Sequence, residues 1–64
     1  MGNLDWQSVG SAWEAHSFGN VYRLEPYGRE WRLEAEVSGD RYVFSGTERR
    51  LRDMAEELEL QSVI

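Results

Sequence analysis

The side chains best suited to acid–base or metal chemistry in this 64-residue chain are its single histidine, His16, and the carboxylates near it. Glu14 precedes His16 by two residues, a spacing that places both side chains on one face of an extended strand. A common zinc site needs further His or Cys ligands, and the chain has one His and no Cys. We therefore expect His16 to be solvated and expect the protein to bind no metal ion or other cofactor.

Enzymatic chemistry finds little support in the remaining residues. Glu34 and Glu36 alternate with apolar residues, which predicts an open sheet face for them, whereas a general acid needs a desolvated pocket to raise its pKa. The chain contains neither a Gly-rich phosphate loop nor a nucleophile elbow. All seven cations are Arg, so no Lys amine is present to act as a nucleophile. We predict that the protein is not an enzyme.

Length and charge restrict the class of protein further. A length of 64 residues predicts one small domain. Because the chain has no Cys, no disulfide can stabilise this domain, and its large aromatic side chains must do so. A net charge of −5 disfavours non-specific attraction to nucleic acid or to anionic membranes. No apolar run is long enough to span a bilayer, and no signal-peptide pattern is visible, so we expect a soluble cytoplasmic protein.

Residues 30–37 alternate strictly between charged and apolar side chains, which predicts the central strand of an antiparallel sheet. Gly, Pro and Asn residues flank it and separate further short alternating runs. The sequence thus predicts a four-stranded antiparallel meander with turns at 19–20, 26–29 and 39–40. The expected strands cover residues 13–18, 21–25, 30–37 and 41–44.

Register follows from the turn lengths, because residues opposed in an antiparallel pair share a face of the sheet. These turns place apolar side chains of all the expected strands on one common face. The expected partners are Val37 with Tyr42, Leu24 with Trp31, and Ala15 with Leu24.

A C-terminal helix is predicted over residues 47–60. Ser45 and Glu48 have the spacing of a capping box, with Ser45 as the N-cap. Apolar residues then recur at helical spacing, and a sheet with one apolar face needs such a helix to cover it. The fold class expected is α+β, with one helix packed on the sheet. The stripe consists of Leu51, Met54, Ala55 and Leu58.

The N-terminal residues 1–12 are predicted to form an arm or a short helical turn before a domain of residues 13–64. Asn3 and Asp5 are good helix N-caps, but Gly10 weakens a helix. A longer helix over 4–17, ended by Gly19, is an open alternative.

The acidic end of the predicted helix is the first candidate binding surface. The last turns of the predicted helix contain Glu56, Glu57 and Glu59, although the helix dipole favours cations at this end. Carboxylates at a helix end that disfavours them point to a function. Leu60 lies off the apolar stripe and offers an apolar anchor. We expect these four residues to bind a protein partner that has a basic surface.

The sheet face away from the helix is the alternative surface. The expected register places His16, Arg23 and Arg32 in one cationic row, with Phe18 and Val21 exposed nearby. Such a row fits a small nucleic-acid-binding module, which we rank below protein binding. We also expect self-association as a homodimer, through the edge strand at 13–18 or through this face.

The sequence resembles small proteins encoded by bacteriophages and prophages. The likeness covers residues 13–60, through Trp13-Glu14-Ala15, Phe18-Gly19, Tyr22, Trp31-Arg32-Leu33, Phe44 and the short acidic helix. The resemblance implies a β-meander with a helix and no catalytic site. It also implies a protein that acts in the host cytoplasm by binding and blocking a host protein, including defence nucleases, as an inhibitor, an adaptor or a nucleic-acid mimic.

Overall fold

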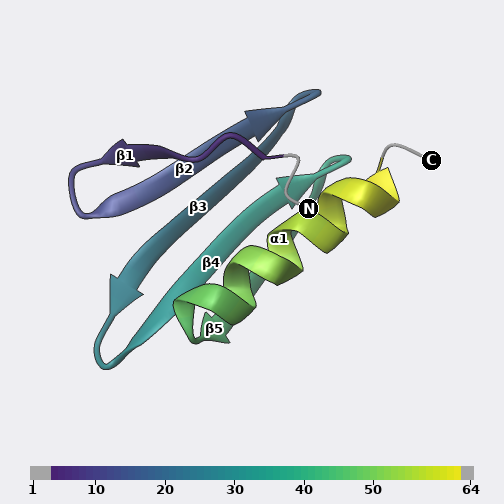
Figure 1. Cartoon of the computed structure of the whole chain (residues 1–64). Coiled ribbons are helices and arrows are strands. Elements are labelled where there is room, and N and C mark those ends of the chain that lie inside the picture. The colour runs from purple at the N-terminus through teal and green to yellow at the C-terminus, as the bar shows by residue number, and fades with distance from the viewer. Residues whose placement is uncertain (1–3, 63–64) are drawn as a thin grey trace.

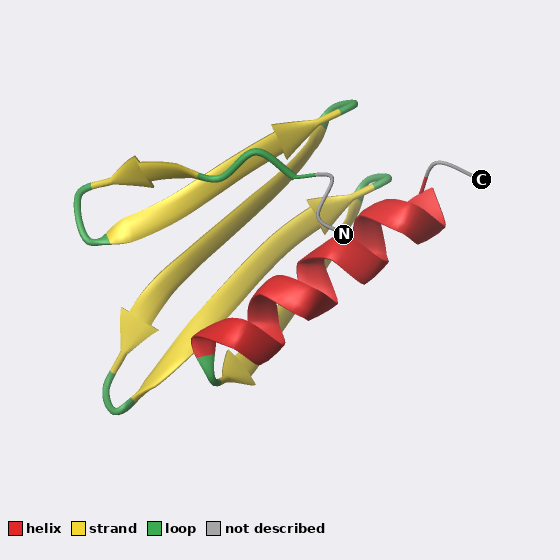
Figure 2. Cartoon of the chain, viewed as in Figure 1, coloured by secondary structure: helices red, strands yellow, loops and turns green. Residues whose placement is uncertain are grey.

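The computed structural model describes residues 4–62, so residues 1–3 of the predicted arm and 63–64 of the predicted domain lie outside the described residues. An antiparallel sheet with strands in sequential order carries one C-terminal helix on one face (Figures 1 and 2). This arrangement confirms the predicted α+β meander. Its elements are β1 (Gln7–Val9), β2 (Ala12–Ser17), β3 (Asn20–Tyr27), β4 (Glu30–Val37), β5 (Asp40–Gly46) and α1 (Glu48–Ser62).

The sheet has five strands, where the sequence predicted four. Residues 7–9, expected in an arm or helical turn, form β1 and pair with β2. Gly10 has a φ of 63°, which allows a tight turn where a helix would have to continue. The alternative helix over 4–17 is therefore wrong, and β2 is not a sheet edge; β1 and β5 are the edges.

Two of the hairpin turns begin one residue earlier than predicted. They are Phe18-Gly19 and Ser38-Gly39, with φ values of 52° and 82° in the first and 54° and 85° in the second. A turn with positive φ at both central residues matches the right-handed twist of the flanking strands. Glycine takes the second position of each turn, whereas the prediction placed it first.

The turn predicted at 26–29 is two residues long, where the sequence predicted four. Gly28 and Arg29 alone connect β3 to β4, and Pro26 belongs to β3. β2 pairs with β3 only as far as Leu24, so the missing N–H of Pro26 interrupts no ladder on that side.

These changes shift each predicted register by two residues, an even number, so the side chains that remain in strands keep their predicted faces. Its neighbours across the strands change. The predicted partners Val37–Tyr42, Leu24–Trp31 and Ala15–Leu24 are wrong; the observed partners are Val37–Asp40, Leu24–Leu33 and Ala15–Tyr22.

The core lies between α1 and the sheet, as predicted. The largest fully buried side chains are Tyr22, Leu24, Leu33 and Leu51, and burying such side chains is the main favourable term in folding. α1 packs chiefly over β4. Its N-cap is Thr47, not the predicted Ser45: the Arg50 N–H donates to Thr47 Oγ1 at 3.2 Å.

Candidate functional site

The N-terminal segment that precedes β1 lies against α1 and is held there by contacts that the sequence did not reveal. Leu4 is buried in the core, and its N–H donates to Glu56 Oε2 at 3.1 Å. The Arg52 guanidinium carbon lies 5.2 Å from the ring centre of Trp6 and 5.0 Å from that of Trp13. Cation–π contacts of this kind fix Trp6 beside the helix.

This docking leaves a hollow of about 560 Å³ between the N-terminal segment and α1. We call it the acidic hollow. Three of the four residues predicted to bind a partner line it: Glu56, Glu57 and Leu60. Leu60 is 50% exposed, as an apolar anchor must be. The complete lining is Leu4, Trp6, Arg52, Asp53, Glu56, Glu57 and Leu60.

Charge in the acidic hollow is predominantly negative. Asp53, Glu56 and Glu57 contribute carboxylates, and Arg52 contributes the one cation of the lining. The charge of Arg52 is engaged by other groups of the chain. Its Nε and Nη2 donate to Glu48 Oε2 at 3.1 and 2.9 Å, and the face of its guanidinium lies against the indole rings of Trp6 and Trp13. The hollow therefore suits a cationic group flanked by apolar atoms.

Glu59 is not part of this surface, which corrects the predicted acidic patch. Its side chain is 3% exposed and points into the interface between helix and sheet. It accepts hydrogen bonds from Ser17 Oγ at 2.5 Å, Tyr22 Oη at 2.7 Å and Asn20 Nδ2 at 3.2 Å. Asn20 extends the network, because its Nδ2 also donates to Ser62 Oγ at 2.9 Å and its Oδ1 accepts from Ser38 N at 3.1 Å.

Hydrogen bonding sets the ionisation of this network. Burial acts to raise the pKa of Glu59, but the donors Ser17, Tyr22 and Asn20 outweigh it and hold the pKa below the ordinary value of a glutamate. Burial, the hydrogen bond to Glu59 and its negative charge raise the pKa of Tyr22. The cluster thus holds a neutral phenol against a carboxylate, and it fastens the last turns of α1 to β2 and β3.

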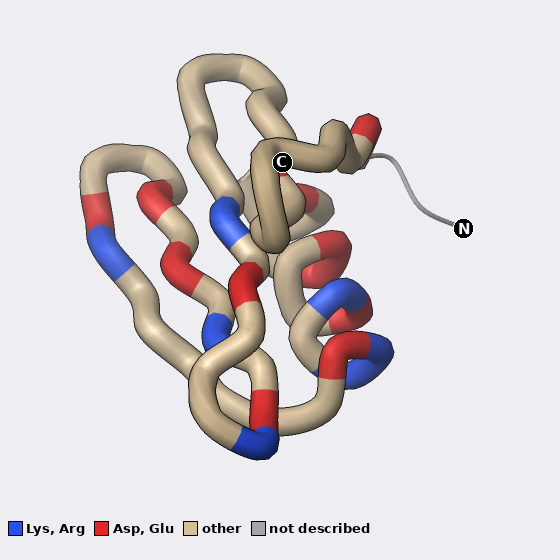
Figure 3. Tube along the Cα trace, turned by 90° about the vertical axis from the view of Figure 1, so that its left-hand side faces the viewer, with Lys and Arg blue, Asp and Glu red and all other residues tan. Residues whose placement is uncertain are grey.

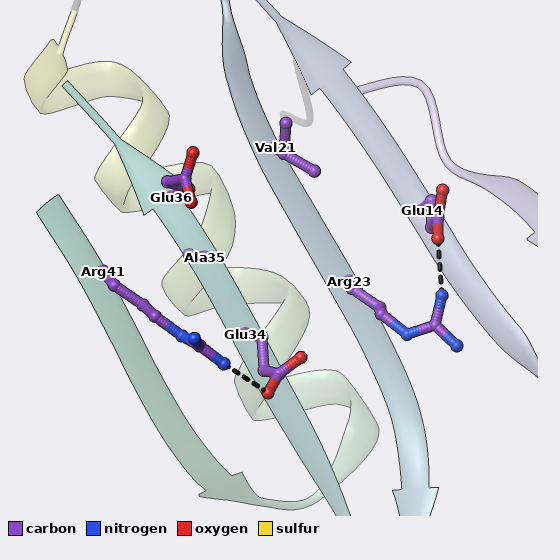
Figure 4. A pocket seen from close by; sticks show the side chains of 7 residues that line it. All are labelled: Glu14, Val21, Arg23, Glu34, Ala35, Glu36 and Arg41. Atoms are coloured by element: carbon purple, nitrogen blue, oxygen red, sulfur yellow. Dashed lines mark hydrogen bonds and ion pairs between the residues drawn. The ribbon is translucent and has the colours of Figure 1, made fainter. Parts of the chain in front are cut away.

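The sheet face away from α1 does not carry the predicted cationic row. Arg23 lies between Glu14 of β2 and Glu34 of β4, because the observed register differs from the predicted one by two residues. Its Nη1 is 2.5 Å from Glu14 Oε2. Arg41 Nη2 approaches Glu34 Oε2 at 3.0 Å, and Figure 4 shows both pairs around a hollow of about 280 Å³.

The other residues of the alternative site are dispersed. Val21 lines the hollow of the open face with Arg23. His16 is exposed and lies opposite Val21 of β3 in the sheet. Its Nε2 is 3.7 Å from Glu14 Oε1. The Arg32 guanidinium forms an ion pair with Glu34 and lies 5.1 Å from the ring centre of Tyr27. Phe18 is at the tip of the β2–β3 turn and is 86% exposed.

Positive charge on the open face is therefore neutralised locally. Acidic and basic positions are interspersed along the chain in Figure 3. A phosphate backbone would have to displace carboxylates from these arginines, so the geometry gives the nucleic-acid alternative no support.

Two further properties bear on the chemistry of the chain. Within residues 4–62, no group of three or more His, Asp or Glu side chains is placed to hold a metal ion. In the same range, α1 is too short and too polar to cross a membrane.

Comparison with known proteins adds no relative: no protein-family model, curated protein or solved structure matches the chain.

Proposed function

We propose that the protein is a small, non-enzymatic interaction module that binds a protein partner with a basic surface through the acidic hollow. The observation that carries this proposal is the meeting of Asp53, Glu56 and Glu57 with exposed Leu60 in one hollow. A partner Arg or Lys can place its charged head against the carboxylates while its aliphatic stem covers Leu60 and Trp6.

The arrangement favours fast and selective binding. Exposed carboxylates attract a cationic partner during diffusion, and an apolar anchor beside them slows its release. The resemblance to small phage-encoded proteins extends the proposal: the partner is a host protein whose basic site the chain blocks or adapts. A basic site that normally contacts nucleic acid is the kind of target this chemistry fits.

Capture from a bacterial lysate tests the proposal. The immobilised wild-type chain is compared with a double variant, Asp53→Arg with Glu57→Arg, which reverses the two exposed carboxylates of the hollow. The matched control, Glu30→Arg with Glu36→Arg, makes the same change in net charge at two exposed positions outside the acidic hollow.

We expect wild type and control to retain one basic protein and the hollow variant to lose it. Circular dichroism of all three proteins checks the fold. Retention of the same protein by the hollow variant would refute this site, and capture of nucleic acid instead would refute the function.

A further inference from the structure

β5 is a sheet edge of seven residues that lacks the usual protection against pairing with another chain. Protected edges carry Lys or Pro, a bulge or a covering element. β5 contains neither Lys nor Pro, and its register with β4 runs without interruption from Gly46 to Asp40. Its one cation, Arg41, is drawn back to Glu34 of β4. From this edge we infer that the protein forms a symmetric homodimer in which β5 pairs antiparallel with β5 of a second copy.

Hydrogen-bond geometry fixes the centre of this pairing. In a hairpin with a two-residue turn, the pair that flanks the turn is hydrogen-bonded, and hydrogen-bonded pairs then alternate along the ladder. Val37 and Asp40 flank the turn here. The N–H and C=O groups of Arg41, Val43 and Ser45 must therefore point away from β4, toward the free edge. Because these residues are centred on Val43, a two-fold axis at Val43 satisfies all of them at once.

Side chains on the helix side of β5 are self-complementary in this register. Tyr42 and Phe44 are partly buried and stacked, with ring centres 6.3 Å apart and planes 8° from parallel. The two-fold axis brings Tyr42 of each copy opposite Phe44 of the other, in a pair without backbone hydrogen bonds, where side chains lie closest. The rings of both copies then form one apolar cluster beneath the two helices.

Charge is complementary at both ends of the pairing. Asp40 lies opposite Gly46 of the other copy, and Gly46 has no side chain to fill the space beside it. Arg50 occupies that neighbourhood, because its Cδ is 3.9 Å from the position that a Cβ of Gly46 would take. Within residues 4–62, neither Asp40 nor Arg50 has an ion-pair partner. The dimer supplies one to each.

A hollow lies at the C-terminal end of β5, beside Gly46. It measures about 460 Å³ and is lined by Phe44, Gly46, Arg50 and Met54, with Glu30 also on its wall. The register directs Asp40 and Tyr42 of the second copy into it. This hollow is separate from the acidic hollow on the far side of α1, so the dimer does not depend on the proposed function.

Sedimentation equilibrium over a concentration series tests the dimer. We expect the wild type to show twice the 7.5 kDa chain mass at high micromolar concentration. Val43→Pro removes an outward N–H without breaking the pairing with β4, and should weaken dimerisation by about tenfold or more. Ser8→Pro is the matched control, because Ser8 occupies the corresponding outward position on the other edge, β1.

A charge swap keeps the inference testable if Val43→Pro disturbs the fold. Asp40→Arg should dissociate the dimer, and adding Arg50→Asp to the same chain should restore it. The inference would be overturned if the wild type were monomeric or if the charge swap failed to restore the dimer. It would also be overturned if Ser8→Pro abolished the dimer while Val43→Pro retained it. Pairing of β5 with a different protein, with no self-association, would also overturn it.

Discussion

The Tyr22 hydroxyl donates a 2.7 Å hydrogen bond to Oε1 of Glu59 and so ties the middle of the sheet to the last turns of the helix. Tyr22 is fully buried and Glu59 nearly so, which means that neither group can turn to water if the other is removed. A hydrogen bond to a charged group in such a place stabilises the fold more than an exposed one does.

Removing this hydroxyl gives the first prediction. Tyr22→Phe should lower the free energy of unfolding by about 1.5–3 kcal/mol, the usual contribution of a hydrogen bond to a charged group. Tyr42→Phe is the control, because the described structure assigns no hydrogen bond to the Tyr42 hydroxyl, and it should change stability little. Urea denaturation measures both, and equal losses would contradict the role given to Glu59.

Acid should destabilise the protein partly through Glu59. Its hydrogen bonds hold its folded pKa below the unfolded value, so the stability it contributes is complete above the ordinary glutamate pKa of about 4.3 and is lost as the pH falls through the folded pKa. Glu34, whose pKa is lowered by the Arg32 hydrogen bond, adds to the same trend. Glu59→Gln should flatten the decline in the urea midpoint between neutral pH and acid. An unchanged decline would show that Glu59 does not titrate as proposed.

The helix stripe gives a graded prediction. Leu51 is fully buried, and Leu51→Ala should cost about 2–5 kcal/mol of stability because it leaves a cavity in the core. Leu58 lies on the same predicted stripe but is only partly buried, so Leu58→Ala should cost less. Thermal melts rank the two variants, and a greater loss for Leu58→Ala would contradict the observed packing.

The β2–β3 turn stores backbone strain that a substitution should relieve. Phe18 has a φ of 52° and is 86% exposed, so it occupies a left-handed conformation without packing in return. Asn tolerates this conformation, and Phe18→Asn should stabilise the protein by up to about 1 kcal/mol. Gly19→Ala, at a φ of 82°, should destabilise it. A loss of stability with Phe18→Asn, or a gain with Gly19→Ala, measured by chemical denaturation, would mean that the turn differs from the one described.

Within the four predicted strands, period-2 alternation was sufficient to predict the face of each residue that stays in the sheet, because a register error of two residues preserves the face. It was insufficient to predict neighbours across the strands, because a glycine can take either position of a two-residue turn. The cationic row through Arg23 and Arg32 depended on those neighbours and therefore vanished, whereas the apolar core did not.

Burial of Glu59 was missed because it follows other acidic residues and was assigned to the surface with them. A signal was present in the sequence. Glu59 lies four residues after Ala55 on the buried side of the helix, and Ser17 is a polar residue on the strand face that meets the helix. Two polar residues directed at one core indicate a buried network. Asn20, which the sequence places in a turn, is the first residue of β3 in the structure. The docking of Leu4 and Trp6, by contrast, depends on long-range packing that no local pattern encodes.

The footprint of the captured partner on the protein tests the proposed function most directly. Amide resonances of the uniformly ¹⁵N-labelled chain are recorded with and without that partner. We expect the largest shifts to fall on Asp53, Glu57 and Leu60 and on the indole N–H of Trp6, and added salt to weaken binding. Shifts confined to the open sheet face around Arg23 and Arg32, with the acidic hollow unperturbed, would contradict this expectation.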